Sequence, residues 1–268
     1  MHKLKQRYRY SVILLRELVR TDFKIRYQNS ILGYVWSLLR PLLLFLILYF
    51  VFTKFLKVGN GVPHYPVYLL LGLLFWNFFI EVTMGSVTSI VGKSDLIRKI
   101  NFPKYVIILA VLMGALINLS LTSVVIVIFM IAGHVPVTWH ALILIPLIIE
   151  LIVMALAVAF FLSTAFVKYR DVSYIWEVII QAAFYATPIL YPLTRIPHAF
   201  AKILILNPFA QIIQDSRYVL ITHSTETIST VYGGDRWIWA IPIGITVVAA
   251  AITSTYFRRR SKAFAEEV

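Results

Sequence analysis

The stretch LILIPLIIELIVMALAVAFFLSTAFV, residues 142–167, decides the fold class. It is a continuous apolar run with a single charged side chain, Glu150, and it shows none of the alternation typical of a strand. About 20 mostly apolar residues in a helix cross the hydrocarbon core of a bilayer, which is about 30 Å thick. The stretch therefore predicts a transmembrane helix.

The composition extends this prediction to the whole chain. Of its 268 residues, 60% are hydrophobic and 14% are charged, whereas charged residues make up roughly a quarter of a soluble domain. We therefore expect an all-α integral membrane protein, folded as a single transmembrane domain over residues 1–268. Six segments are long and apolar enough to span: 31–55, 66–91, 106–133, 142–167, 173–191 and 237–257.

The positive charge is distributed asymmetrically among the connecting segments. Lys and Arg concentrate in residues 1–30, in the loop 92–105, after the fourth span at Lys168 and Arg170, and in the tail 258–268. By the positive-inside rule these segments are cytoplasmic, so both termini face the cytosol. The net charge of +13 is thus a topology signal and not a nucleic-acid footprint.

Residues 1–30 predict an amphipathic helix at the inner membrane interface. Apolar side chains recur at helical spacing at Tyr8, Val12, Leu15, Val19 and Phe23. Asp22 and Arg26 fall on the same face, where we expect them to pair at i,i+4. The helix is either a simple surface anchor or also a docking site for a cytoplasmic partner.

The loop SIVGKSDLIRKINFPK, residues 89–104, includes Gly-Lys-Ser but is not a phosphate-binding loop. Such a loop needs a glycine five positions before the second one, where this chain has Val87. Instead a short helix is predicted, in which a few apolar side chains project among charged ones. Such a helix suits a groove on another protein. The alternative is a solvated loop that serves only to set the membrane topology. Its docking candidates are Lys93, Asp95, Leu96, Ile97, Arg98 and Lys99.

The segment after the fifth span predicts two short helices. Residues 196–206 are apolar but only about half as long as a span, and Asn207-Pro208 separates them from a second piece, 211–221. We expect a re-entrant pair that dips into the membrane between the fifth and sixth spans. An external amphipathic cap is the alternative.

Aromatic residues line one face of the first and fifth spans. Rings stack on the C–H faces of sugars, so these faces are candidates for a saccharide path; packing or an interface belt is the alternative. The candidates are Tyr34, Phe45, Tyr49, Phe52, Trp176, Phe184 and Tyr191.

Ionisable residues inside spans are also candidates for function. Arg40 and Glu81 lie at similar depth, roughly 15 Å from the cytosolic end of their helices, and we expect a structural ion pair between them.

The six His residues are scattered and Cys is absent, so neither a metal site nor a disulfide is predicted. A membrane enzyme such as a glycan-lipid transferase would need a cluster of acids or His, which the sequence lacks.

Three stretches carry a family resemblance: RELVRTDFKIRYQNSILGYVWSLLRPLL at 16–43, IRKINFPKY at 97–105, and KYRDVSYIWEVIIQAAFYATPILYP at 168–192 followed by NPF. In order and spacing the chain resembles the permease subunit of type-2 ATP-binding-cassette (ABC) exporters. The branch it resembles moves lipid-linked polysaccharides such as O-antigens, capsules, galactans and teichoic acids. A drug, lipid or other exporter of the same superfamily is the nearest alternative, and a channel working alone is another.

The resemblance implies a homodimer in the bacterial inner membrane, bound to two copies of a separate ATPase. ATP and Mg²⁺ would reside on that partner, and this chain would hold no cofactor and no metal. The loop 92–105 would couple the ATPase to the membrane, and the first and fifth spans would line the path of a lipid-linked glycan. Basic side chains at the inner mouth would receive its pyrophosphate, with Lys24, Arg26 and Arg40 as candidates.

Overall fold

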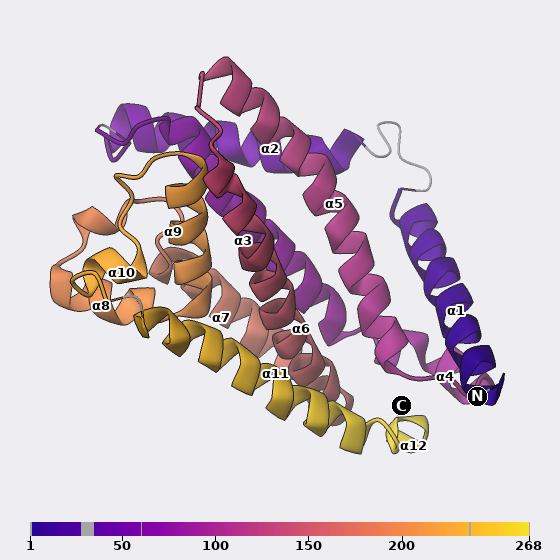
Figure 1. Cartoon of the computed structure of the whole chain (residues 1–268). Coiled ribbons are helices and arrows are strands. Elements are labelled where there is room, and N and C mark those ends of the chain that lie inside the picture. The colour runs from indigo at the N-terminus through magenta and orange to yellow at the C-terminus, as the bar shows by residue number, and fades with distance from the viewer. Residues whose placement is uncertain (1, 28–34, 60, 236, 268) are drawn as a thin grey trace.

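The computed structural model describes residues 2–27, 35–59, 61–235 and 237–267 (Figure 1). Every regular element in those ranges is a helix. Helices satisfy all their backbone hydrogen bonds internally, which lipid requires of any spanning segment. The predicted all-α membrane fold is therefore confirmed.

Among the described residues, five helices are long and apolar enough to cross a membrane. They are α2 (Val35–Phe50) with its π-helical extension η1 (Val51–Phe55), α3 (Tyr65–Val87), α5 (Tyr105–Ala132), η3 (Trp139–Ile143) with α6 (Leu144–Lys168), and η5 (Trp237–Trp239) with α11 (Ala240–Arg260). These bounds agree with the predicted ones to within a few residues. The predicted fifth span is the shorter α7 (Val172–Ala186), which ends where the backbone becomes extended at Thr187, before Pro188.

Helix α3 forms the centre of the bundle. It contacts α2, α5, α6, α7 and α9, and 78% of its most apolar window is buried, against 28% or less in the other four long helices. A helix that is apolar all round suits such a central position. The other spans keep large apolar side chains on the outside, as expected of a surface that meets lipid.

The two short helices predicted after the fifth span are present as α8 (His198–Ile205) and α9 (Pro208–Leu220). Asn207 caps α9 by accepting a hydrogen bond from the backbone N–H of Phe209, 3.0 Å away. Nearly all of α9 is buried against α3, α6 and α11, so it enters the bundle and does not lie on it as an external cap. A further short helix, α10 (Ile228–Val231), starts with a capping box at Thr227 and packs on α8 and α9.

The side chain of Arg217 connects α9 to the rest of the bundle. It is fully buried, and its guanidinium donates to the backbone carbonyls of Tyr68, Pro188 and Ile189 at 3.1, 2.7 and 2.6 Å. The same group lies 3.6 Å from the centre of the Tyr68 ring. Gly72 leaves room for it, because a Cβ there would lie 2.6 Å from a guanidinium nitrogen.

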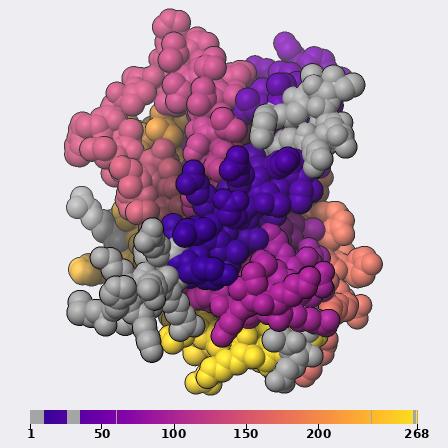
Figure 2. Space-filling model, turned by 90° about the vertical axis from the view of Figure 1, so that its right-hand side faces the viewer, coloured from indigo at the N-terminus to yellow at the C-terminus, as the bar shows by residue number. Residues whose placement is uncertain are grey.

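The N-terminal helix α1 (His2–Tyr27) packs along α5 (Figure 2). Its inward stripe contains Ser11 and Leu18, flanked by Leu15 and Val19, whereas Val12 is 47% exposed. The prediction was an apolar face at the membrane interface, with which an exposed Val12 is compatible, so the interface role of α1 stays a prediction. The side chain of Tyr8 lies outside the described residues.

Both ends of the chain lie at the same end of the bundle as α4 (Ser94–Lys99), as Figure 1 shows. The 3₁₀ turn η2 (Val91–Lys93) leads into α4, and the C-terminal α12 (Phe264–Glu267) packs on α4 and α6. Phe264 is 0% exposed and lies 5.6 Å, ring centre to ring centre, from Phe257. The C-terminal segment is thus part of the folded structure at this end.

Replacing Arg217 by leucine is expected to lower the stability of the full-length chain by about 3 kcal/mol or more. The substitution leaves three buried carbonyl oxygens without their donor, and each such loss costs about 1–3 kcal/mol. Thermal unfolding in detergent measures the effect. Arg195→Leu removes an exposed arginine from a nearby segment and is expected to change stability by less than about 0.5 kcal/mol; equal unfolding temperatures for both variants would contradict the assignment.

Candidate functional site

A groove with aromatic walls lies between α2, α3 and α7. Its volume is about 280 Å³, and we call it the α2–α3–α7 groove. It is lined by Leu44 of α2, by Leu73, Trp76, Asn77 and Ile80 of α3, and by Ile180, Gln181, Phe184 and Tyr185 of α7. Aromatic rings with a few amide groups are the side chains that sugar faces and hydroxyls require.

The floor of this groove is a cluster of rings centred on Trp76. Its ring centre lies 5.7 Å from that of Phe184 and 5.1 Å from that of Phe209 of α9. Phe79 in turn lies 6.4 Å from Trp176 and 5.1 Å from Phe209. The aromatic face of α7 is therefore packed on α3, with α9 supporting the same rings.

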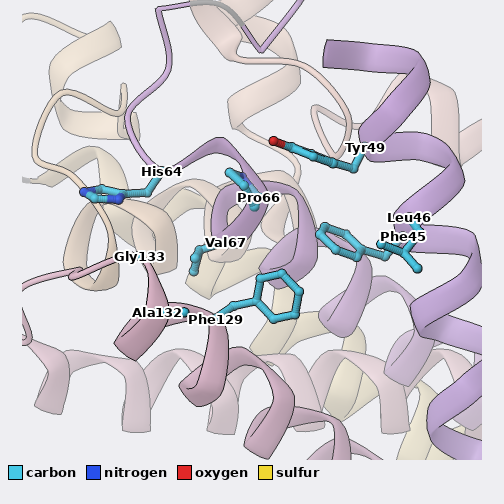
Figure 3. A pocket seen from close by; sticks show the side chains of 9 residues that line it. All are labelled: Phe45, Leu46, Tyr49, His64, Pro66, Val67, Phe129, Ala132 and Gly133. Atoms are coloured by element: carbon cyan, nitrogen blue, oxygen red, sulfur yellow. The ribbon is translucent and has the colours of Figure 1, made fainter. Parts of the chain in front are cut away.

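A second hollow, of about 340 Å³, lies where α2 meets the start of α3 and the end of α5 (Figure 3). Phe45 stacks on Tyr49 at 5.8 Å and meets Phe129 of α5 edge to face at 5.4 Å. Figure 3 shows these rings gathered at one side of the hollow. Tyr49 continues the row to Tyr65 at 6.4 Å.

The predicted path residues are thus divided between two places on α3. Phe184 lines the α2–α3–α7 groove and Phe45 and Tyr49 line the second hollow, while Phe52, Trp176 and Tyr191 are half-buried. Tyr34 lies outside the described residues. Phe45 is only 1% exposed, so in this chain it is a packing residue.

Of the aromatic and amide residues of the groove, the sequence analysis named Phe184 and missed four: Trp76, Asn77, Gln181 and Tyr185. The prediction followed stripes on single helices, and α3 is apolar all round, so no stripe marks its groove face. Asn77 and Gln181 were available signals, because each is an amide inside an apolar run.

The predicted Arg40–Glu81 ion pair is not formed. Glu81 instead accepts a hydrogen bond from the side-chain amide of Asn118 of α5 at 2.7 Å, and Arg40 is exposed. Equal depth along two helices does not by itself bring two side chains into contact. Lys24 is also exposed, and the side chain of Arg26 lies outside the described residues, so a phosphate-binding role for Lys24, Arg26 and Arg40 stays a prediction.

The loop that contains α4 presents a polar surface while its apolar side is buried. Ile97 is 3% exposed and belongs to the core, and Leu96 is half-buried. The expectation that Ile97 projects as an apolar knob was therefore wrong, because α4 packs on α12 and the side chain of Ile97 joins the core. Asp95, Arg98 and Lys99 remain on the exposed side.

Lys93 connects this loop to α1. Its ammonium group donates to both carboxylate oxygens of Asp22, at 2.8 and 2.9 Å. The side chain of Arg26, the predicted partner of Asp22, lies outside the described residues, so that pairing stays a prediction; the Lys93 contact was not predicted. At the other end of the loop, Lys104 lies 4.7 Å from the centre of the Phe102 ring, and partial burial lowers its pKa.

The chain resembles known proteins over most of its length. A sequence profile of the ABC-2 type transporter family matches residues 13–221. The O-antigen export system permease protein RfbA of Klebsiella pneumoniae is 34% identical, over 86% of this chain and 93% of that protein. The protein of the same name from Myxococcus xanthus is 28% identical, over 99% of this chain and 98% of that protein. The polysialic acid transport protein KpsM of Escherichia coli is 24% identical, over 82% of this chain and 86% of that protein.

A double-mutant cycle on Asp22→Ala and Lys93→Ala is expected to give a coupling free energy of about 0.2–1 kcal/mol. The value is modest because the two side chains are 42% and 22% exposed, where water screens the pair. Unfolding of the wild type, both single variants and the double variant measures it. Strictly additive losses would mean that the pair does not join α1 to the loop.

Proposed function

The chain belongs to the ABC-2 type transporter family, and from that premise we propose that it is the membrane permease of an ATP-driven exporter of lipid-linked polysaccharide. The observation that carries the proposal is the similarity, over 82% or more of this chain, to permeases named for O-antigen export and polysialic acid transport. The multi-pass fold and the α2–α3–α7 groove support it.

The groove of one chain is small for a polymer, which favours a path shared by two copies. α7 exposes a row of large apolar side chains that includes Tyr174, Val178 and Tyr185, at 72%, 68% and 69%. In a homodimer α2 and α7 of both copies would enclose one path, with Tyr34, Phe45, Tyr49, Phe52, Trp176, Phe184 and Tyr191 as lining candidates. Phe45 joins it only if its ring turns away from Phe129.

ATP and Mg²⁺ would be held by a separate ATPase subunit, of which two copies bind the dimer. Its docking surface on this chain is the exposed side of α4, formed by Asp95, Arg98 and Lys99. Motion of α4 would reach α1 through Lys93 and the core through Ile97. The position of α4 beside both ends of the chain supports a topology with cytosolic termini in a bacterial inner membrane.

The substrate would enter from that same side. Its pyrophosphate needs cationic donors, and Arg40 and Lys24 are exposed on elements that flank residues 28–34. Arg26 precedes the same segment. The glycan would then meet the rings and the amides of Asn77 and Gln181.

Tyr185→Ala is expected to lower polysaccharide export about two- to tenfold, the effect of losing one aromatic contact of about 0.5–1.5 kcal/mol. The residue is 69% exposed in the groove, so assembly is expected to be unchanged. Surface polysaccharide in cells that express the complete exporter measures it. Phe161→Ala removes a ring of α6 that is 49% exposed and lies outside the groove, and it is expected to export normally; equal export by both variants would overturn the groove assignment.

Lys99→Glu is expected to reduce co-purification of the ATPase and ATP turnover in the complex, with the unfolding temperature unchanged. The side chain is exposed on the proposed docking surface, so reversing its charge affects a partner and not the core. Arg259→Glu makes the same change on an exposed residue at the same end of the bundle and serves as the control. Full ATPase binding by Lys99→Glu would place the docking surface elsewhere.

A further inference from the structure

A third and larger cavity lies between α6, α9 and α11, apart from the α2–α3–α7 groove. Its volume is about 760 Å³, within the range of ligand pockets. Most of its wall is apolar, including Leu147 and Val153 of α6 and Ile243 and Val247 of α11. It lies toward the start of α6 and of α11, so at the end of the bundle opposite to both termini.

Four of the polar side chains that line this cavity are Glu150, Gln211, Asp215 and Thr246. Three of them are almost fully buried, with Gln211 2%, Thr246 3% and Asp215 4% exposed. One hydrogen bond joins two of them, from the amide nitrogen of Gln211 to a carboxylate oxygen of Asp215 at 2.6 Å.

One oxygen of each of these four side chains has no hydrogen-bond partner among the described residues. Three are carboxyl or amide oxygens, which accept hydrogen bonds but cannot donate them when the acids are ionised. Buried polar atoms almost always have partners, and leaving one unsatisfied costs about 1–3 kcal/mol. The cavity therefore calls for an occupant rich in N–H or O–H donors.

Two further properties of the cavity indicate which class of molecule would occupy it. Glu150 and Asp215 together favour a positive charge, and the apolar walls favour hydrocarbon beside it. A metal ion is a poor match, because no group of three or more His, Cys, Asp or Glu gathers in the described part of the chain. An amphiphile with a protonated primary amine satisfies both properties.

We propose that the α6–α9–α11 cavity binds an aminophospholipid of the phosphatidylethanolamine type. Its ammonium group donates to the oxygens of Glu150, Asp215 and Gln211, and its acyl chains lie along the apolar walls. The hydroxyls of Ser229 and Thr230 and the rings of Tyr218 and Trp239, which also line the cavity, flank the phosphate region.

The same chemistry excludes close relatives of this lipid. Phosphatidylcholine carries the positive charge but has no N–H donor, so the four oxygens stay unsatisfied. Phosphatidylglycerol has hydroxyl donors but a net negative charge, which the two carboxylates repel. A pyrophosphate-linked glycan is repelled for the same reason, so this cavity is distinct from the proposed export path.

The test is lipid retention by the full-length chain, purified in detergent with an equimolar mixture of the three phospholipids and analysed by native mass spectrometry. The wild type is expected to retain phosphatidylethanolamine about tenfold over each of the other two. The variant with Glu150→Gln and Asp215→Asn keeps the shapes of both side chains and removes their negative charges. Its retention of phosphatidylethanolamine relative to each of the other two lipids is expected to fall to about one.

Two further variants test whether a loss of lipid retention could come from misfolding. Val153→Trp fills the apolar part while both carboxylates remain, and it is expected to reduce retention of phosphatidylethanolamine. Glu226→Gln removes a carboxylate that lines a different hollow, and it is expected to retain the lipid as the wild type does. Equal retention of the three lipids by the wild type, or an unchanged preference in the Glu150→Gln, Asp215→Asn variant, would show that the cavity holds only water or unselected lipid.

Discussion

The buried guanidinium of Arg217 is the interaction on which the rest of the bundle depends. A cation removed from water is costly unless every donor is used, and here the acceptors are carbonyls of α3 and of the chain after α7. Once α9 is held in this way, Phe209 supports the rings under the α2–α3–α7 groove. Asp215 of the same helix is directed into the cavity beside α6 and α11.

The opposite end of the bundle is organised around a helix of six residues, α4. A helix so short is not stable by itself. It is held by Lys93 on Asp22 of α1, by the buried Ile97, and by α12, whose Phe264 is fully buried. α4 is therefore connected to both ends of the chain and to the core, and Asp95, Arg98 and Lys99 lie exposed between these anchors.

Hydropathy predicted where the spanning helices begin and end, because lipid permits little other backbone structure. It did not predict how each helix is rotated about its axis. Ile97 was placed on the exposed side but is buried, and the predicted Arg40–Glu81 pair is not formed, because rotation is set by packing between helices far apart in sequence. The role of Arg217 was not predicted, since its acceptors are backbone carbonyls that no sequence pattern marks. Of the residues that line the groove, only Phe184 was predicted, through its stripe on α7, and Trp76 was not.

The length of α7 has a consequence for the lipid around it. Its 15 residues reach about 22 Å at 1.5 Å per residue, whereas the hydrocarbon core is about 30 Å thick. A short apolar helix is matched by local thinning of the bilayer. Because α7 forms one wall of the groove, the membrane is thinnest beside the proposed path, and a polar chain that crosses there has less hydrocarbon to traverse.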